Sequence, residues 1–584
     1  MPRLPSLPLR RTPPGRGRIP KIRTPKEPES RLGPRKIGVI DVGSNTSRLI
    51  ILAHTPGVSF RLIDQVREQV RLSEGMGAEG LLRAQPMERT IRLLRVFRGL
   101  CEANDIDTIV AVGTSAVRDA RNQTEFLKRI REEVGLTLRV LTGEEEAHYG
   151  FLGAVNSLAI GNSLVVDIGG GSMELVRVED RRPVKTVMLP AGAVRLTEAF
   201  LREDPPKAAE IRTLSRYIEY LLRDLSWIEG GPGESLVGMG GTIRTLAKID
   251  QHLQDYPLDR VHGYVLSRRR LEQIVQRLAK LPLRKRRKFP GLSSDRADVI
   301  LAGALVLFQV LEQAGYGELV VSGQGLREGV FYEHFLRDTG RDTVENPRAF
   351  GLANLSLLYD LNWPHARHVE RLAVSLFDQL RPLHRYGDPE RATLSAAALL
   401  HDLGLAIDYY SHHEYSSRIL LDADLPGFRH REVALMSQLV LYHRRGMPKA
   451  QPFPGLLTHD DDERIRKLGA LLRLAEYLER SRTQVVHTIR CRIQPRSVTL
   501  ECLVRGDAST ELWATERKSD LFQDAFKKSL ILRMRQAPVP RSSIRPADDS
   551  RVDPLSRRMR EIMALATKPK SRGTLKKAQT AGDA

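Results

Sequence analysis

The fold of this chain is decided by Ile37–Leu52, IGVIDVGSNTSRLIIL, which is typical of a strand, a tight polar turn and a second strand. Gly43 lets the backbone approach a ligand closely, and the polar residues after it offer hydroxyl, amide and backbone N–H groups to an anion. These residues are Ser44, Asn45 and Thr46. Asp41 ends the first strand beside them. We therefore predict a phosphate-binding turn, with Asp41 close to a phosphate that carries a metal.

The same hairpin recurs 126 residues later as LVVDIGGGSMELVRV, Leu164–Val178, in which Asp167 takes the place of Asp41. Seven positions after each aspartate the two copies differ, because the first has Arg48 and the second has Glu174. Duplicated hairpins at this spacing predict two similar α/β lobes that face each other across a cleft. A phosphate chain is expected to lie between the two turns.

The composition predicts a globular protein of a reducing compartment. The 584 residues suffice for about four domains. Three scattered cysteines exclude a disulfide framework, and the longest apolar run is too short to span a membrane. Residues 1–36 hold 11 Lys and Arg against 2 acidic residues, and residues 537–584 hold 11 against 5. We expect a cytoplasmic protein with two disordered basic tails, which are either solvated or anchors for a polyanion.

Two further segments of the N-terminal third contribute candidate site residues. Thr108–Val112 is predicted as a strand that leads to Arg118, which is either a phosphate ligand with a forked guanidinium or an ordinary surface arginine. Thr142 begins a helix, and Glu145 three residues later completes a capping box, which accounts for Glu145. Glu146 has no such role and lies one strand–helix unit before the second phosphate turn. We therefore predict that Glu146 is a general base.

A third glycine turn, Gly240-Gly241-Thr242, opens a helix, where backbone N–H groups favour an anion. Further along, Arg284–Lys288 is a run of five basic residues, which is either a solvated loop or a feed for a polyanion near the cleft. The glycine turn extends the phosphate-binding pattern of the second lobe.

From about residue 346 the pattern becomes helical and rich in histidine. His365, and His401 beside Asp402, fall on neighbouring predicted helices, an arrangement that can build a buried divalent-metal site. The alternative is a set of unrelated surface and core histidines. Residues 485–532 alternate as short strands and then a helix, which predicts a small α/β cap.

These segments resemble the exopolyphosphatase and guanosine pentaphosphate phosphohydrolase family of the actin, Hsp70 and sugar-kinase superfamily. The resemblance covers about residues 37–335 in eight ordered blocks, among them IGVIDVGSNTSRL, TGEEEAHYGFLGAV, VVDIGGGSMEL and VSGQGLREGV. It implies two ribonuclease-H-like lobes whose cleft binds the end of a phosphate chain, with Glu146 as the base and Mg²⁺ on Asp167 and Glu174. The phosphate ligands that it implies are Asp41 to Thr46, Arg118, Gly169, Gly170, Gly171 and Ser172.

Residues 346–490 resemble the HD-type helical domain of longer family members, in blocks such as HARHVERLAVSLFDQL and AALLHDLG. The metal ligands that this resemblance implies are His365, His401, Asp402 and Glu479. The sequence departs from the family pattern at Tyr415, where a histidine is missing, and at Glu476 and Glu479, where the family has aspartate. We therefore expect this domain mainly to shape access to the cleft.

The expected fold class is α/β, with two ribonuclease-H-like lobes followed by an all-helical domain and a small α/β cap. Its parts are a basic tail at 1–36, phosphatase lobes at 37–160 and 161–340, an HD-type domain at 346–484, the cap at 485–535 and a second basic tail at 536–584.

The expected activity is removal of terminal orthophosphate from inorganic polyphosphate, with guanosine pentaphosphate as a second substrate. The basic segments and an aromatic content of 5% favour the long polyanion over a nucleotide. Two other functions stay open: an ATP-dependent kinase or ATPase whose adenosine pocket uses residues 238–242, and a non-catalytic module that binds polyphosphate or nucleic acid. No membrane partner is expected, and a homodimer is one open arrangement.

Overall fold

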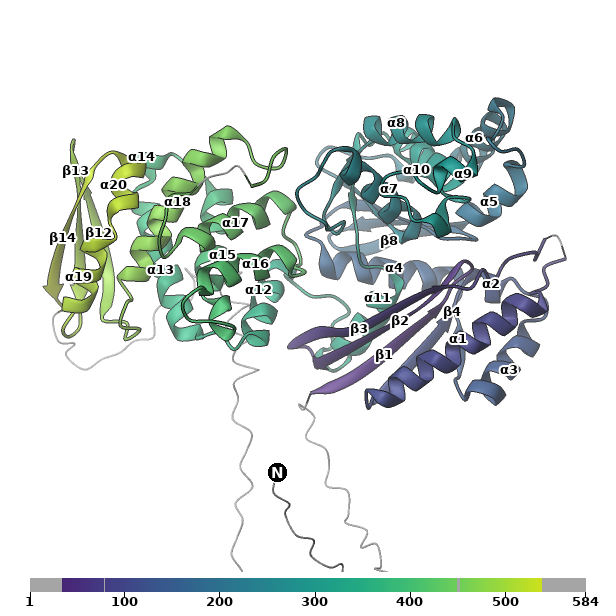
Figure 1. Ribbon diagram of the computed structural model, residues 1–584, viewed down its shortest axis with the longest axis horizontal. Coiled ribbons are helices and arrows are strands. Elements are labelled where there is room, and N and C mark those ends of the chain that lie inside the picture. Colours follow the sequence, from purple (N-terminus) through teal and green to yellow (C-terminus); the bar gives the residue numbers. More distant parts are fainter. Residues whose placement is uncertain (1–33, 78, 449–451, 538–584) are drawn as a thin grey trace, which may run out of the picture. The chain divides into compact units, whose positions relative to one another are not determined.

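The computed structural model of the protein describes residues 34–77, 79–448 and 452–537. The first lobe is built on a five-stranded mixed sheet in the order β3-β2-β1-β4-β5 (Figure 1). Its strands are β1 (Arg35–Val42), β2 (Thr46–Thr55), β3 (Ser59–Gln69), β4 (Thr108–Gly113) and β5 (Leu138–Val140). Its helices are α1 (Ala84–Ala103), α2 (Ser115–Arg118), α3 (Gln123–Val134) and α4 (Gly143–Ser157). The predicted basic tails fall outside the described residues, apart from a few residues at their inner ends.

The second lobe repeats this topology with one additional strand. Its sheet has the order β10-β11-β9-β6-β7-β8, so β6, β7, β8, β9 and β11 correspond to β1, β2, β3, β4 and β5. Its strands are β6 (Ser163–Ile168), β7 (Met173–Glu179), β8 (Arg182–Leu189), β9 (Ser235–Met239), β10 (Val265–Ser267) and β11 (Glu318–Val321). Its helices are α5 (Ala193–Phe200), α6 (Ala208–Leu222), α7 (Gly240–Leu253), α8 (Arg268–Ala279), α9 (Leu283–Arg286), α10 (Ile300–Gln313) and α11 (Leu326–Leu336). The prediction of two duplicated ribonuclease-H-like lobes is confirmed.

Strand β1 is buried on both faces, which explains its unbroken apolar run. Ile37 and Val39 belong to the large core that also contains α4 and α11, whereas Ile40 and Val42 belong to the core under α1 and α3. A third core fills the outer side of the second lobe. Since the first core includes inner-face residues of both sheets, α4 and α11 are packed between the lobes.

Helices α4 and α11 approach each other so closely that their backbones touch. A Cβ atom on Gly153 of α4 would lie 2.3 Å from the carbonyl oxygen of Gly325, and one on Gly329 of α11 would lie 1.9 Å from that of Tyr149. Any larger residue at 153 or 329 would push the helices apart. This contact sets the position of Glu146, which lies one turn before Tyr149 on α4.

The C-terminal part consists of a helical region and a small sheet, as predicted. Its first helices are α12 (Pro347–Leu358), α13 (Trp363–Gln379), α14 (Arg381–His384), α15 (Asp388–Leu400), α16 (His412–Asp422), α17 (His430–Tyr442) and α18 (His459–Tyr477). The sheet has the order β12-β13-β14, with β12 (Val486–Ile493), β13 (Ser497–Val504), β14 (Ser529–Gln536), α19 (Ser509–Arg517) and α20 (Asp520–Phe526). The HD-type assignment of the helices and the domain boundaries remain predictions.

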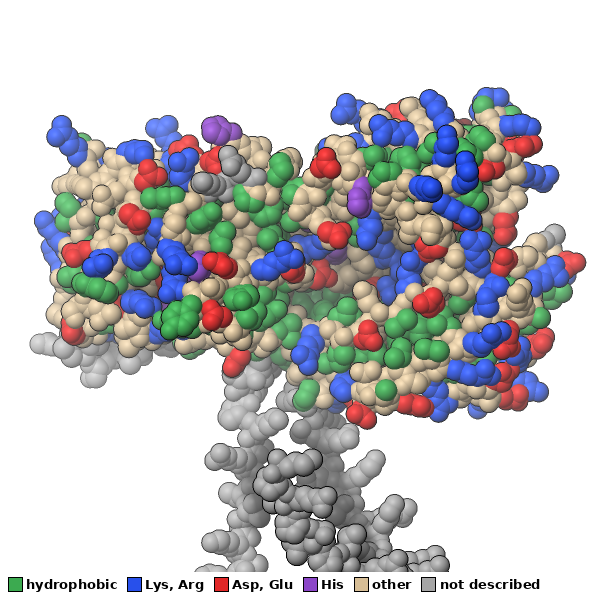
Figure 2. Space-filling model, viewed as in Figure 1, with side chains coloured by type: hydrophobic (Ala, Val, Ile, Leu, Met, Phe, Trp, Pro, Cys, Tyr) green, Lys and Arg blue, Asp and Glu red, His purple; other side chains and the backbone are tan. Residues whose placement is uncertain are grey.

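The basic run at α9 is only partly a surface feature. Arg286 is buried, donates hydrogen bonds to the Leu281 and Ala297 carbonyls, and pairs with Asp204 at 3.0 Å. The other four basic residues of the run are exposed, and Figure 2 shows Lys and Arg side chains gathered over the region of α8 and α9. The expectation that all five residues feed a polyanion therefore has to be reduced to four. Among the described residues, no helix is long and apolar enough to cross a membrane.

Candidate functional site

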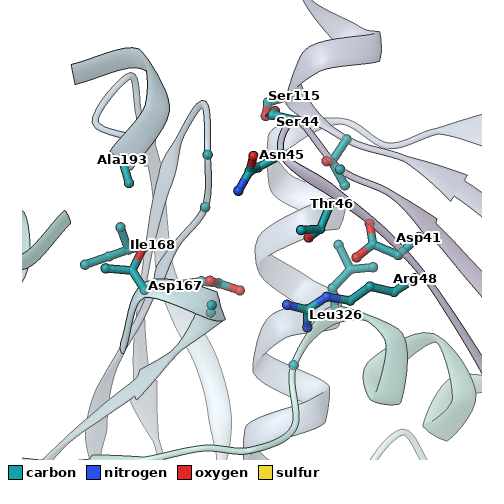
Figure 3. A pocket seen from close by; sticks show the side chains of 18 of the residues that line it. Asp41, Ser44, Asn45, Thr46, Arg48, Ser115, Asp167, Ile168, Ala193 and Leu326 are labelled. Carbon is teal, nitrogen blue, oxygen red and sulfur yellow. The ribbon is translucent and has the colours of Figure 1, made fainter. Parts of the chain in front are cut away.

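A pocket between the two lobes brings together most of the residues predicted for the phosphate site. In Figure 3, Asp41 and Arg48 of the first lobe lie on one side of it, and Asp167 of the second lobe lies on the other. The predicted residues that line it are Asp41, Gly43, Ser44, Asn45, Thr46, Glu146, Asp167, Gly169, Gly170, Glu174, Gly240, Gly241 and Thr242.

The two hairpin turns have the same backbone hydrogen bond and meet at their tips. Gly43 N–H donates to the Thr46 carbonyl at 3.2 Å, and Gly169 N–H donates to the Ser172 carbonyl at 3.0 Å. A Cβ atom on Gly170 would lie 3.1 Å from the Ser44 Cβ atom, so the second turn needs a glycine at this place. The pocket at this end is therefore narrow and lined by backbone N–H groups and hydroxyls, which suits phosphate oxygens.

Five carboxylates from both lobes line the pocket, and burial raises the pKa of four of them. The pKa of Glu146 is raised to about 7 and that of Asp167 to about 6. The pKa of Asp41 is raised by burial, against Arg327 and Arg48. Burial, followed by the charges of Glu146 and Asp167, raises the pKa of Glu174 well above its ordinary value. Burial thus disfavours the charged form of each of these four carboxylates, and a bound cation would favour it.

Glu146 and Glu145 have the separate environments that the sequence predicts. Thr142 Oγ1 accepts from the Glu145 backbone N–H at 3.1 Å, and the Glu145 carboxylate accepts from the Thr142 N–H at 2.9 Å, which is the predicted capping box. The Glu146 carboxylate instead accepts a hydrogen bond from Arg118 Nη1 at 2.8 Å. Arg118 therefore contacts Glu146 and is not among the residues that line the pocket. Its role as a phosphate ligand remains a prediction.

The lining also contains four arginines to which the sequence analysis gives no role: Arg48, Arg244, Arg296 and Arg327. Burial, with neighbouring arginines, lowers the pKa of Arg48 well below its usual range and that of Arg296 to about 10. Arg327 lies 3.3 Å from Glu328, and Arg244 donates to the Gly323 carbonyl. Arg244 and Arg327 each follow a glycine turn within the first helical turn, and this recurring placement is the signal by which both were recognisable in the sequence.

A second cluster of ionisable groups lies inside the helical region. His365 Nε2 is 3.3 Å and His401 Nε2 is 3.0 Å from the same Glu476 oxygen, while His365 Nε2 is 3.6 Å from Asp402. His443 lies beside His401 and Asp402. Both ring nitrogens of His365 and one oxygen of Asp402 are buried without a hydrogen-bond partner. These orphaned donors and acceptors suit a metal ion.

Of the two glutamates near this cluster, Glu476 and not the predicted ligand Glu479 lies at its centre. Glu476, on the last turn of α18, points at His365 and His401. Glu479 lies beyond the end of α18, where its carboxylate accepts from the Gln484 backbone N–H and lies 3.4 Å from His368. It approaches His365 only at Nδ1, at 3.9 Å. Glu476 therefore replaces Glu479 at the centre of the cluster, because the helix end turns the second glutamate away.

Two lobes of one duplicated ribonuclease-H-like topology, with paired glycine turns and buried carboxylates between them, define a phosphate-handling protein of the actin-like superfamily. Residues 50–338 match the Ppx/GppA phosphatase family, and residues 348–511 match Ppx/GppA phosphatase, domain III. The chain therefore belongs to the Ppx/GppA phosphatase family. Enzymes of this family are metal dependent.

Named relatives agree with this assignment. The chain is 30% identical over 467 residues to the guanosine-5'-triphosphate,3'-diphosphate pyrophosphatase of Aeromonas hydrophila, a match that covers 76% of this chain and 88% of the relative. The corresponding protein of Vibrio vulnificus is 27% identical over 446 residues, covering 76% and 86%. The crystal structure of the Aquifex aeolicus family member is 33% identical and covers 53% of this chain and 100% of its own, with a TM-score of 0.47.

Proposed function

We propose that the protein hydrolyses terminal phosphoanhydride bonds, releasing orthophosphate from inorganic polyphosphate and from guanosine pentaphosphate at one site. The observation that carries this proposal is the meeting of two glycine turns beside Glu146, a carboxylate without a capping role. The turns supply N–H and hydroxyl groups for phosphate oxygens, and Glu146 is placed to accept a proton from an attacking water.

The pocket residues divide the work of such a reaction. Arg118 fixes one oxygen of Glu146 by its hydrogen bond, which leaves the other oxygen to orient water. The turns at 43–46 and 169–172 would hold the terminal phosphate. Asp167 and Glu174 would hold Mg²⁺, which suits oxygen ligands, and one Glu174 oxygen is buried with no hydrogen-bond partner. When bound, the ion would neutralise charge on the phosphoryl oxygens.

Both substrates fit the charge distribution of the pocket. The arginines Arg48 and Arg296 come from different lobes and, within the described residues, their guanidinium groups have no carboxylate within salt-bridge distance. They are free to bind a second phosphate group of the same substrate, as guanosine pentaphosphate has and as the next units of polyphosphate supply.

Replacing Glu146 tests the proposal. We expect Glu146→Gln to lower the rate of phosphate release by about 10²- to 10⁴-fold while substrate binding is nearly retained, because the base is lost and the shape is kept. Glu145→Gln is the matched control, since it affects only a cap and an ion pair with Arg139 outside the pocket, and it should cost about 1 kcal/mol of stability or less. Equal loss of activity in both variants, or near-normal turnover by Glu146→Gln, would contradict the assignment of the base.

The two rival functions have distinct products. A kinase or ATPase that used residues 238–242 for adenosine would form ADP from ATP and release no phosphate from polyphosphate. A binding module would hold polyphosphate or nucleic acid without turnover and would lose affinity when residues 1–36 and 537–584 are removed. Phosphate release from polyphosphate by the full chain excludes both rivals.

The histidine cluster supports a second proposal, a structural transition-metal site on His365, His401, Asp402 and Glu476. Histidine nitrogens with carboxylates are ligands that such metals prefer. Metal analysis of the full chain checks this directly: we expect about one ion per chain, lost in the double variant His365→Ala, Glu476→Ala and retained in His459→Ala, whose side chain is exposed. A metal content that is the same in all three proteins would overturn the site.

A further inference from the structure

The loop that joins β11 to α11 is held from three directions, and it supplies one edge of the phosphate pocket. Gly325, at the end of this loop, and the first residues of α11 line the pocket. Within the loop, Ser322 Oγ donates to the Gln324 carbonyl at 2.7 Å, and Gly325 N–H donates to Glu328 at 2.8 Å. The 322–325 loop is therefore an ordered element whose carbonyl groups have fixed directions.

On the pocket side, the loop orients Arg244. Arg244 Nη1 donates a hydrogen bond to the Gly323 carbonyl at 2.8 Å. Across the described ranges, this is the hydrogen bond that the Arg244 guanidinium makes to the protein, and Arg244 is one of the residues that line the pocket. A change in the direction of the Gly323 carbonyl would therefore move a cation that faces the phosphate site.

Behind the loop, His262 fixes the same glycine from the other end of its peptide. His262 Nδ1 accepts from the Gly323 backbone N–H at 3.0 Å, so Nε2 carries the proton, and it donates to the Ser157 carbonyl at 3.2 Å. Ser157 is the last residue of α4. A Cβ atom on Gly323 would lie 2.9 Å from the His262 Cβ atom, so imidazole and loop are in tight contact.

The helical region reaches this arrangement through two hydrogen bonds. Gln324 Nε2 donates to Asp424 Oδ2 at 3.0 Å, and His430 Nε2 donates to the His262 carbonyl at 2.8 Å. Asp424 lies between α16 and α17, and His430 is the first residue of α17. A continuous set of hydrogen bonds therefore runs from the helical region, through His262 and Gly323, to Arg244 in the pocket.

We propose that His262 is a positioning residue for phosphate binding, which acts through the Gly323 peptide on Arg244, and that Asp424 couples the helical region to it. This inference rests on the proposed function in one respect, namely that the ligand of the pocket is a phosphate chain. It assigns a task to the helical region that does not require that region to have an activity of its own.

Two substitutions separate the roles of the imidazole nitrogens. In His262→Asn the amide oxygen replaces Nδ1 as the acceptor for Gly323, whereas in His262→Gln the longer amide retains a donor for Ser157 and loses that acceptor. Loss of that acceptor lets the Gly323 peptide turn and Arg244 shift with it, so we expect His262→Gln to weaken phosphate binding roughly tenfold, with His262→Asn close to the unsubstituted chain. Asp424→Ala should weaken binding several-fold.

The probe is inorganic tripolyphosphate, and its binding to the full chain is measured by calorimetry in EDTA so that no turnover occurs. A double-mutant cycle identifies the route. In the Arg244→Met background, His262→Gln should weaken binding no further, because the residue through which it acts is absent. Thermal unfolding of each variant shows whether the fold is retained.

Two results would overturn the proposal: equal weakening by His262→Asn and His262→Gln, or a His262→Gln effect that persists in full without Arg244. Absence of tripolyphosphate binding by the unsubstituted chain would overturn it as well. If binding follows the expected pattern but no phosphate is released when metal is added, the positioning role stands and the proposed hydrolase function fails.

Discussion

The first lobe presents Asp41 and Arg48 to the pocket on β1 and β2, and the second presents Asp167 and Glu174 on the corresponding strands β6 and β7. The helices that follow also correspond. The fourth residue of α4 is Glu146, and the fourth residue of α11 is Gly329. The duplication thus places a glycine turn on both sides of the pocket, whereas Glu146 and Glu174 correspond to Gly329 and Arg48, which have no carboxylate. The pocket is therefore symmetric in its glycine turns and asymmetric in its carboxylates.

The sharpest way to break this asymmetry is Glu174→Gln. We expect kcat to fall by about 10²- to 10³-fold, the usual effect of removing one preorganised charged group at a reacting phosphoryl or carbonyl centre. Glu179→Gln, an exposed position on the same strand, is the control and should have no effect. Phosphate release at saturating substrate gives kcat for both variants. A normal kcat for Glu174→Gln would show that the difference between Arg48 and Glu174 in the two lobes does not affect catalysis.

A second difference between the lobes, the buried His54 of the first lobe, makes stability depend on pH. Strand β2 extends to Thr55 and buries His54, whose ring lies 5.8 Å from that of Phe331 and 5.3 Å from that of His334. Both ring nitrogens of His54 are without a hydrogen-bond partner, and burial lowers its pKa to about 4, with a further contribution from His334 and Arg35 against Asp107. The unfolded chain therefore binds a proton that the folded chain excludes.

Since the folded pKa is depressed, the stability from neutral His54 is complete above about pH 6.5 and is lost as the pH falls towards 4. At about 1.4 kcal/mol per pKa unit, the free energy of unfolding should decrease by roughly 2–3 kcal/mol over this range, and His54→Leu should remove that part of the decrease. Urea unfolding at pH 7.5 and pH 5 checks this. The same decrease in the variant and in the natural chain would refute the role of His54.

Gly329 of α11, which corresponds to Glu146 of α4, lies in the close contact between these two helices. Gly329→Ala places a Cβ atom against the Tyr149 carbonyl, so we expect a loss of about 1–3 kcal/mol of stability from overpacking. Gly99→Ala is the matched control, because Gly99 is also helical and has no atom within 4 Å of an added Cβ, and it should gain up to about 1 kcal/mol. Destabilisation of similar size in both variants, measured by thermal unfolding, would contradict the close contact.

The smallest expected effect concerns the exposed basic residues of the second lobe. Replacing Arg284, Lys285, Arg287 and Lys288 with glutamine should lower kcat/KM for long polyphosphate a few-fold at low salt and little at high salt, because charge of this kind acts on association and is screened over ~8 Å at physiological ionic strength. Guanosine pentaphosphate should be nearly unaffected. Phosphate release from both substrates is measured at two salt concentrations. A decrease in kcat/KM that does not depend on salt, or that is equal for both substrates, would contradict the role of these residues in association.

The lobes and most of the pocket could be predicted because their signals are local. The glycine turn after Asp41 recurs after Asp167 with the same alternation of apolar residues, and the capping box at Thr142 separates Glu145 from Glu146 within four residues. Each of these patterns depends only on backbone geometry and near neighbours. Such patterns can be recognised in the sequence without knowledge of the packing.

The parts that could not be predicted depend on distant contacts. Arg48 and Arg296 line one pocket although 248 positions separate them in the chain, and no local sequence pattern predicts that they lie together. Glu476 rather than Glu479 contacts both His365 and His401, because α18 ends at Tyr477, a boundary that the sequence does not mark sharply. Arg286 looks like its exposed neighbours in the sequence, and only the packing against Asp204 shows that it is structural.

The backbone contact between α4 and α11 also constrains how the pocket can open. Because the backbones already touch at Gly153 and Gly329, we expect rotation about this contact, and not a larger displacement of one helix along the other, when the pocket opens. Glu146 lies one turn from this pivot, whereas the phosphate turns at 43–46 and 169–172 belong to the sheets of the two lobes. Opening for substrate entry would therefore move the turns more than Glu146, so the proposed proton acceptor would keep its position relative to both helices.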